Sequence, residues 1–217
     1  MTSGWSQAMI LSLDQMQALA AQCAPSVAAE TLLSVAKVES GFDPLAIGVN
    51  GAPAIHVQAS SRQEAVEKAA ALVADGRSVD LGLAQINSRN LDWLGLTIDA
   101  AFDPCRNLAA SARVLQDGYA RGVRREAGEQ PALLEALSYY NTGDPHRGFR
   151  NGYVAKVTMA AAAIVPALKP TADPVVPASP QERDAPPQPA WAVFGGEKAD
   201  DGFVIRISST PTNGGQP

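Results

Sequence analysis

At 217 residues the chain is long enough for one well-buried domain of ordinary size and some additional sequence. Its formal charge of −5 excludes a general nucleic-acid-binding protein, because binding to phosphates requires a basic face. A hydrophobic fraction of 46% is typical of a globular protein, and no run approaches the roughly 18 uninterrupted apolar residues of a membrane span. We therefore expect a globular protein that holds its substrate by hydrogen bonds and shape rather than by overall charge.

After an N-terminal extension of residues 1–11, residues 12–165 have a mostly helical pattern, which predicts one domain. Ser12 and Gln15 form a capping box ahead of an apolar stripe at helical spacing. A second helix follows and is expected to end at Gly41. Further helices are predicted at residues 61–76, 88–94, 104–121, 131–140 and 152–164.

Two stretches between these helices are not helical in pattern. Asn50-Gly51 favours a short hairpin that continues through residues 54–58. Residues 80–87 are too short for a good helix and are interrupted by Gly82. The sequence thus predicts a mainly α fold of the α+β kind, with at most a small β-hairpin.

The composition changes sharply at residues 166–217, which are rich in Pro, Ala and Asp. So few bulky apolar residues cannot offset the entropy of ordering a chain, which predicts a disordered tail. Residues 191–194 and 203–207 are two apolar islands within it. They leave two interpretations open: residual hydrophobicity, or a segment that docks on a partner protein as an added strand.

The two cysteines, Cys23 and Cys105, have no spacing typical of a zinc site, and we expect neither a metal nor a cofactor. Their number alone is compatible with two separate thiols or with a disulfide bond, which would indicate an oxidising compartment. Residues 1–13 contain no Lys or Arg and no sustained apolar run, so they do not resemble a signal peptide.

Glu39 is the candidate acid/base residue. It follows Val35 and Ala36 by four and three residues, so it lies on the apolar face of the second helix, near its C-terminal end. Burial and the negative end of the helix dipole both disfavour a charged carboxylate there and raise its pKa. A carboxyl that stays protonated near neutral pH suits the general acid of glycosidic cleavage. The alternative from periodicity alone is a glutamate that reaches solvent at a helix end.

Three motifs resemble, in order and spacing, the soluble lytic transglycosylase family, whose domain is similar to goose-type lysozyme. They are V-E-S-G-F-D-P at 38–44, G-L-A-Q-I-N at 82–87 and S-Y-Y-N-T-G at 138–143, followed by Tyr153-Val154. Residues 46–51, 80–83 and 102–108 narrow the resemblance to the VirB-type transglycosylases of type IV secretion and conjugation systems.

This resemblance implies an enzyme of the periplasm or cell envelope that cleaves peptidoglycan strands in a groove between helices and leaves a 1,6-anhydro-muramic end. It implies that Glu39 is the single catalytic acid/base and that Tyr140 hydrogen-bonds its carboxyl. It also favours a disulfide between Cys23 and Cys105, and secretion-system proteins as partners of the tail. The implied substrate-binding residues are Ser40, Gln85, Asn87, Tyr139 and Asn141.

Two departures from the family pattern keep alternatives open. Ala84 stands where the family usually has Met, which is expected to widen the groove, and Gly48 stands where some relatives have Ser. One alternative is a catalytically weak scaffold that binds glycan, and another is a true lysozyme that hydrolyses the same bond. A Ser/His hydrolase is disfavoured, because His56 lies in an insertion and His146 in a turn.

Overall fold

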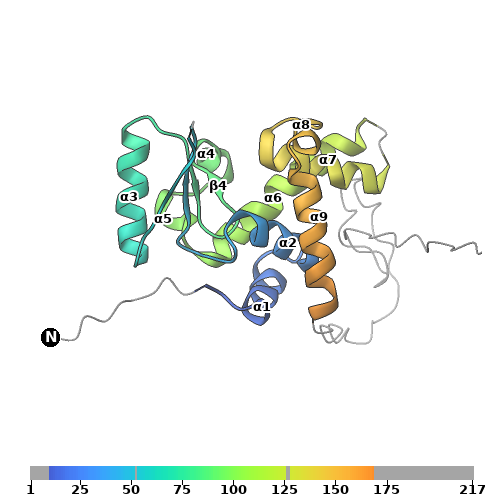
Figure 1. Ribbon diagram of the computed structural model, residues 1–217, viewed down its shortest axis with the longest axis horizontal. Coiled ribbons are helices and arrows are strands. Elements are labelled where there is room, and N and C mark those ends of the chain that lie inside the picture. The colour runs from blue at the N-terminus through green and yellow to red at the C-terminus, as the bar shows by residue number, and fades with distance from the viewer. Residues whose placement is uncertain (1–9, 52, 126–127, 169–217) are drawn as a thin grey trace, which may run out of the picture.

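The computed structural model describes residues 10–168 apart from 52, 126 and 127 (Figure 1). The helices are α1 (Leu13–Cys23), α2 (Ala29–Glu39), α3 (Arg62–Ala74), α4 (Leu91–Leu94), α5 (Ile98–Ala101), α6 (Pro104–Val123), α7 (Glu129–Thr142), α8 (Arg147–Arg150) and α9 (Tyr153–Ile164), with 3-10 turns at Ser88–Asn90 and Val165–Ala167. The strands are β1 (Ile47–Val49), β2 (Ile55–Val57), β3 (Val79–Leu81) and β4 (Ile86–Asn87). Most of the predicted N-terminal extension and of the predicted tail, including both apolar islands, lies outside the described residues.

The domain is mainly helical, as predicted, but its sheet is larger than a hairpin. The four strands are antiparallel in the order β2-β1-β3-β4, and Ile47 of β1 lies opposite both Val57 and Leu81. The hairpin at Asn50-Gly51 is present, whereas β3 and β4 come from the stretch 80–87. Strands of two or three residues contain too little alternation to be recognised in sequence, and β1 is buried at every position.

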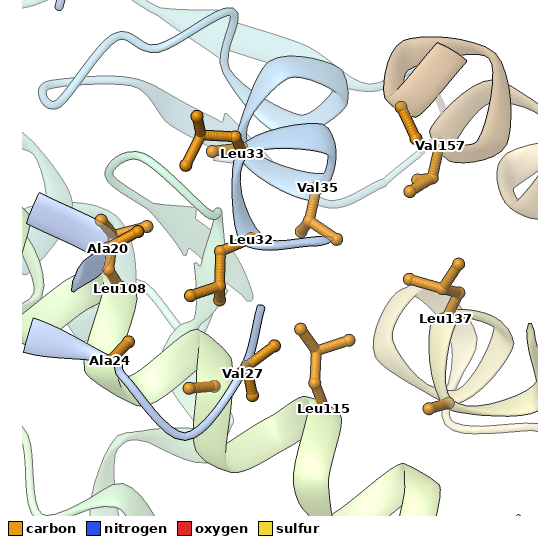
Figure 2. Close-up of a cluster of buried hydrophobic side chains, with 14 of the residues drawn as sticks. Ala20, Ala24, Val27, Leu32, Leu33, Val35, Leu108, Leu115, Leu137 and Val157 are labelled. Carbon is orange, nitrogen blue, oxygen red and sulfur yellow. The ribbon is translucent and has the colours of Figure 1, made fainter. Parts of the chain in front are cut away.

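Helix α2 lies at the centre of the helical part of the domain. Figure 2 shows Leu32 and Val35 of α2 among side chains from the neighbouring helices, and both are completely buried. The labelled neighbours come from α1 (Ala20), α6 (Leu108, Leu115), α7 (Leu137) and α9 (Val157). A helix that is apolar on most of its circumference is fixed by packing on several sides. The last residue of α2 therefore has a well-defined position.

Two glycines allow α6 and α7 to approach each other closely. A Cβ atom at Gly118 would lie 3.0 Å from the Cα of Ala136, and one at Gly122 would lie 2.9 Å from the Cα of Ala132. Larger residues could be accommodated only if the two helices moved apart. The separation of α6 and α7 is therefore set by these positions.

A second apolar cluster lies between the sheet and the helices α3, α5 and α6, at the other end of the domain (Figure 1). It is built around fully buried side chains such as Val79, Leu81 and Phe102. Tyr140 packs against both clusters, so it lies where the helical and the sheet parts of the domain meet. None of the described helices is both long enough and apolar enough to span a bilayer.

The predicted disulfide bond is present. Cys23 at the end of α1 and Cys105 in the first turn of α6 are bonded, with their Cα atoms 5.3 Å apart and a sequence separation of 82. Leu11 and Leu168 also pack against the helical core, so the packed unit extends slightly beyond the predicted limits of 12 and 165.

We expect a Cys23→Ser/Cys105→Ser variant to be folded but less stable. Closing a loop of this length lowers the entropy of the unfolded chain and contributes about 4 kcal/mol in the chain-entropy model, which is an upper guide. Urea unfolding followed by circular dichroism should therefore show a free energy of unfolding lower by about 2–4 kcal/mol. An unchanged midpoint, with the bond shown intact in the parent by thiol counting, would contradict this.

Candidate active site

Glu39 is the last residue of α2, and the end of this helix is attached to the sheet side of the domain. The Ser40 N–H donates to the carbonyl of Ala36 and closes the helix. The Ser40 hydroxyl donates to the Leu83 carbonyl at 2.7 Å. Ser40, predicted to bind substrate, thus has a contact that positions Glu39 relative to the turn that follows β3.

That turn is held by the buried side chain of Asn107. The Asn107 amide donates to the carbonyls of Leu81, at 2.8 Å, and Ala101, at 2.7 Å, and its oxygen accepts from the Ala84 N–H at 2.8 Å. Gly82 has a φ of +71°, and a Cβ there would lie 2.6 Å from the Ala101 carbonyl oxygen. A residue other than glycine would therefore be strained and would displace the backbone around it.

Gln85 follows in a left-handed conformation, with a φ of +50°. A non-glycine residue in this region is uncommon and is often found at functional sites. Its side-chain amide donates to the carbonyls of Ala46, at 3.1 Å, and Gly82, at 2.9 Å. A Cβ at Gly48 would lie 2.8 Å from Gln85 Oε1. Gly48 is therefore the residue that makes room for Gln85.

A cleft of about 300 Å³ opens in front of Glu39. It is lined by six of the predicted site residues, namely Glu39, Gln85, Asn87, Tyr139, Tyr140 and Asn141. Of the predicted catalytic and substrate-binding residues, only Ser40 lies outside this lining. The cleft also contains polar residues that the sequence did not single out, namely Asn50, Asp80 and Asn90.

The pKa of Glu39 is raised from 4.5 to about 7. Burial is the largest cause, because it disfavours the charged carboxylate. A hydrogen bond from Tyr153 lowers the pKa, and the nearby negative charge of Asp80 raises it. At neutral pH about half of the Glu39 side chains therefore carry the proton that a general acid must donate.

The prediction that Tyr140 hydrogen-bonds Glu39 is wrong, because Tyr153 occupies that role. The Tyr153 hydroxyl donates to Glu39 Oε1 at 2.5 Å, from the first residue of α9. The Tyr140 hydroxyl instead donates to the Ala84 carbonyl at 2.6 Å and lies 3.1 Å from Ser111 Oγ. For both tyrosines burial, followed by the charge of Glu39, raises the pKa of the hydroxyl, so both are neutral. Tyr153 was part of one of the family motifs in the sequence. The residues around it gave no indication that its hydroxyl would bind Glu39.

Asp80 of β3 is a second carboxyl group in the cleft. Its Oδ1 accepts from Asn87 Nδ2 at 2.6 Å, and its Oδ2 accepts from Asn50 Nδ2 at 2.8 Å. Burial raises the pKa of Asp80, while the hydrogen bonds from Asn87 and Asn50 lower it. These amides stabilise the anion of Asp80, although burial has the larger effect and the pKa is raised overall. Asn87, predicted to bind substrate, therefore also positions this carboxylate.

Tyr139 and Asn141 of α7 lie at another part of the cleft. Tyr139 is half-buried, and its hydroxyl accepts from Arg125 Nη1 at 3.1 Å. Asn141 is exposed, and its side-chain oxygen accepts from Asn151 at 2.8 Å. Gly143 is the C-cap of α7, two residues after Asn141.

Ala84 does not widen the groove, contrary to expectation. Its side chain is completely buried in the apolar cluster of the sheet side. Only its backbone takes part in the site, through the carbonyl that accepts from Tyr140. The feature that favoured a catalytically weak scaffold therefore lies behind the cleft and not in it.

The protein-family model of the transglycosylase SLT domain matches residues 16–160 of the sequence. This range includes every element of the cleft. The chain belongs to the SLT transglycosylase family. It is thus a peptidoglycan lytic transglycosylase. Within the described residues, no group of three or more His, Cys, Asp or Glu side chains could hold a metal ion.

Relatives of the SLT transglycosylase are similar over most of its length. It is 42% identical to protein virB1 of Rhizobium radiobacter over 205 residues, which cover 93% of this chain and 82% of the relative. It is 41% identical to the type IV secretion system protein virB1 of Brucella suis over 167 residues, covering 71% of this chain and 70% of the relative. No solved structure matches the chain significantly.

The two tyrosines of the transglycosylase should differ in their effect on the pH profile. The prediction that Glu39 is the general acid requires its protonated form, so we expect kcat/KM to fall as pH rises through about 7. Tyr153→Phe removes the hydrogen bond that lowers the Glu39 pKa, so this alkaline limb should move to higher pH. Tyr140→Phe leaves the limb in place and lowers stability instead, because the Ala84 carbonyl loses its donor. Rates measured between pH 5 and 9 on soluble glycan strands would test this, and a shift in Tyr140→Phe alone would contradict it.

Proposed function

We propose that this enzyme cleaves the β-1,4 bond between the MurNAc and GlcNAc units of peptidoglycan and leaves a 1,6-anhydro-muramic end. The proposal depends above all on the buried carboxyl of Glu39, with a pKa of about 7, in a cleft lined with amide side chains. Amides both donate and accept hydrogen bonds, as the hydroxyl and acetamido groups of these sugars require.

In the proposed mechanism Glu39 serves twice. Its carboxyl donates a proton to the glycosidic oxygen as the bond to the anomeric carbon breaks, assisted by the substrate's acetamido group. The resulting carboxylate then takes the proton of the muramic 6-hydroxyl, whose oxygen bonds to the anomeric carbon and closes the anhydro ring. No water is consumed, and Glu39 regains its proton. A pKa near the ambient pH suits both transfers, and Tyr153 fixes the rotamer of the carboxyl through both steps.

We assign to Asp80 the stabilisation of positive charge near the anomeric carbon. Its carboxylate lies close enough to Glu39 to raise the pKa of that residue, and its two amide partners fix its position. Two carboxyl groups in different environments can thus have different roles, one protonated and one ionised.

The relatives named as type IV secretion proteins suggest where the enzyme acts. We infer that it opens the wall locally in the periplasm during assembly of such a system, with the tail of residues 166–217 as the segment for partner proteins.

A true lysozyme is the second candidate, and Asp80 is the observation that favours it. Most glycosidases use two carboxyl groups, of which one activates water or attacks the sugar. Hydrolysis would leave a reducing muramic end that is heavier than the anhydro end by one water. Mass spectrometry of the soluble products therefore distinguishes the two activities.

We expect Glu39→Gln to abolish turnover while preserving the fold. The amide has nearly the same volume and can still accept from Tyr153, but it has no acidic proton to donate. General acid catalysis contributes about 10²–10⁴-fold, and one residue here performs both transfers, so the loss should reach at least the upper end. The measurement is anhydro-muropeptide release from purified sacculi, with circular dichroism to match the variants.

Retention of more than about a tenth of the wild-type rate by Glu39→Gln would exclude Glu39 as the acid/base. If the wild type released products that all had reducing ends, the lysozyme would replace the transglycosylase. If the wild type bound sacculi but released no products, the interpretation as a glycan-binding scaffold would replace both enzymatic interpretations.

Asp80→Asn should lower kcat by about 10–100-fold, less than Glu39→Gln, because it removes a charge and not the transferred proton. Removing the Asp80 charge also lowers the pKa of Glu39, so the alkaline limb of kcat/KM should move below pH 7. Asn87→Ala, which leaves the charge but removes a donor, is the matched control. An unchanged kcat and limb in Asp80→Asn would remove Asp80 from the mechanism.

A further inference from the structure

The charges of the domain are divided between its two halves. Residues 10–103, which include the sheet, contain eleven Asp and Glu but five Lys and Arg. Residues 104–168, which form α6 to α9, contain eight Lys and Arg but five Asp and Glu. The chain is acidic overall, yet the segment that forms α6 to α9 has a net positive charge. A polyanion that reached this cleft would be repelled by one half and attracted by the other.

Two of these arginines lie beside the cleft, next to Tyr139. The Cζ atom of Arg125 lies 5.4 Å and that of Arg121 5.9 Å from the centroid of the Tyr139 ring. Arg125 also donates to the Tyr139 hydroxyl. Both arginines are exposed, whereas Tyr139 lines the cleft. We call these three residues the arginine corner.

Both arginines of the arginine corner form ion pairs with acidic side chains of the same domain. Arg125 Nη2 pairs with Glu135 Oε2, and Arg121 Nε pairs with Asp117 Oδ2 at 2.9 Å. Arg125 is 40% exposed and Glu135 is 15% exposed. The Arg125 guanidinium group faces solvent, so a carboxylate from outside can reach it and compete with the half-buried Glu135. A guanidinium group has five N–H donors in a planar fork that matches a carboxylate.

The muramic units of peptidoglycan carry peptide stems whose free carboxylates make the strand anionic. These groups cannot lie near Glu39 and Asp80, because like charges in a partly buried cleft repel strongly. The stem carboxylates need a positively charged site along the same cleft. This site must remain accessible when the sugar rings are bound. Among the residues lining the described cleft, Tyr139 is the one in contact with guanidinium groups.

We propose that the arginine corner is a subsite for the stem-peptide carboxylates of a muramic unit bound in the cleft. Arg125 releases Glu135 and binds the stem carboxylate in its place. Tyr139 holds the guanidinium group at the cleft. This inference rests on the proposed glycan-cleaving function, and it adds recognition of the stem to recognition of the sugar.

The test compares soluble glycan strands that carry stems with strands stripped of stems by an amidase. Arg125→Ala should raise KM about 5–20-fold on stem-bearing strands, with kcat little changed, and leave KM on stripped strands within about twofold. Arg106→Ala is the matched control: it removes an exposed arginine from the first turn of α6, the helix that contains Arg121, roughly 20 Å or more from Arg121 along the axis. This variant should leave KM unchanged on both substrates.

A variant of opposite sign separates binding from a structural role. Glu135→Gln removes the internal competitor of the stem, so KM on stem-bearing strands should fall about 2–5-fold and become more sensitive to salt. If Arg125 only joined α6 to α7, Glu135→Gln would behave like Arg125→Ala on both substrates. That result, or an equal loss by Arg125→Ala on both strands, would overturn the proposal. Absence of anhydro products from both strands with the wild type would instead overturn the proposed function.

Discussion

The geometry of the cleft depends on one buried amide, the side chain of Asn107. It holds the turn after β3 through three hydrogen bonds to backbone groups. Ser40 attaches the end of α2 to this turn, and Tyr140 attaches α7 to it, each through a backbone carbonyl. Three elements that carry active-site residues thus take their positions from the same few peptide groups. Because no charged group takes part, this framework does not change with pH.

Within this framework, the protonation of the two carboxyl groups in the cleft depends on how far each is shielded from water. Glu39 is buried at the end of an apolar helix, so its proton is retained to about pH 7 even though the hydrogen bond from Tyr153 lowers the pKa. Asp80 is also partly buried but accepts from two amides, which favours its anion. Burial is the main cause of the raised pKa of both residues, and the number of hydrogen-bond donors adds to the difference between them. The substrate's own acetamido and hydroxyl groups complete the set of reacting groups in the proposed reaction.

The sequence predicted what is encoded within a few residues or one helical turn. The capping box at Ser12 and the apolar stripe that places Glu39 at the end of α2 are such features, and both are found. The partner of Glu39 was missed because Tyr153 is 114 residues away in sequence. The partner of Tyr140 was missed because it is a backbone carbonyl, which every residue possesses. Very short elements, such as β4, α5 and α8, contain too few residues to show a period.

The two glycines between α6 and α7 have a further consequence for the substrate. Tyr139 and Tyr140 of α7 and Val114 of α6 all line the cleft, so the separation of the two helices affects its width. A methyl group at Gly118 would lie 3.0 Å from the Cα of Ala136 and 3.3 Å from the Cβ of Tyr139, and one at Gly122 would lie 2.9 Å from the Cα of Ala132, so both would push α7 and its tyrosines away from α6. The width available to a polysaccharide thus depends in part on two positions of α6 that lack a side chain. Variation in substrate thickness among related enzymes can therefore arise at positions that no contact with the glycan would reveal.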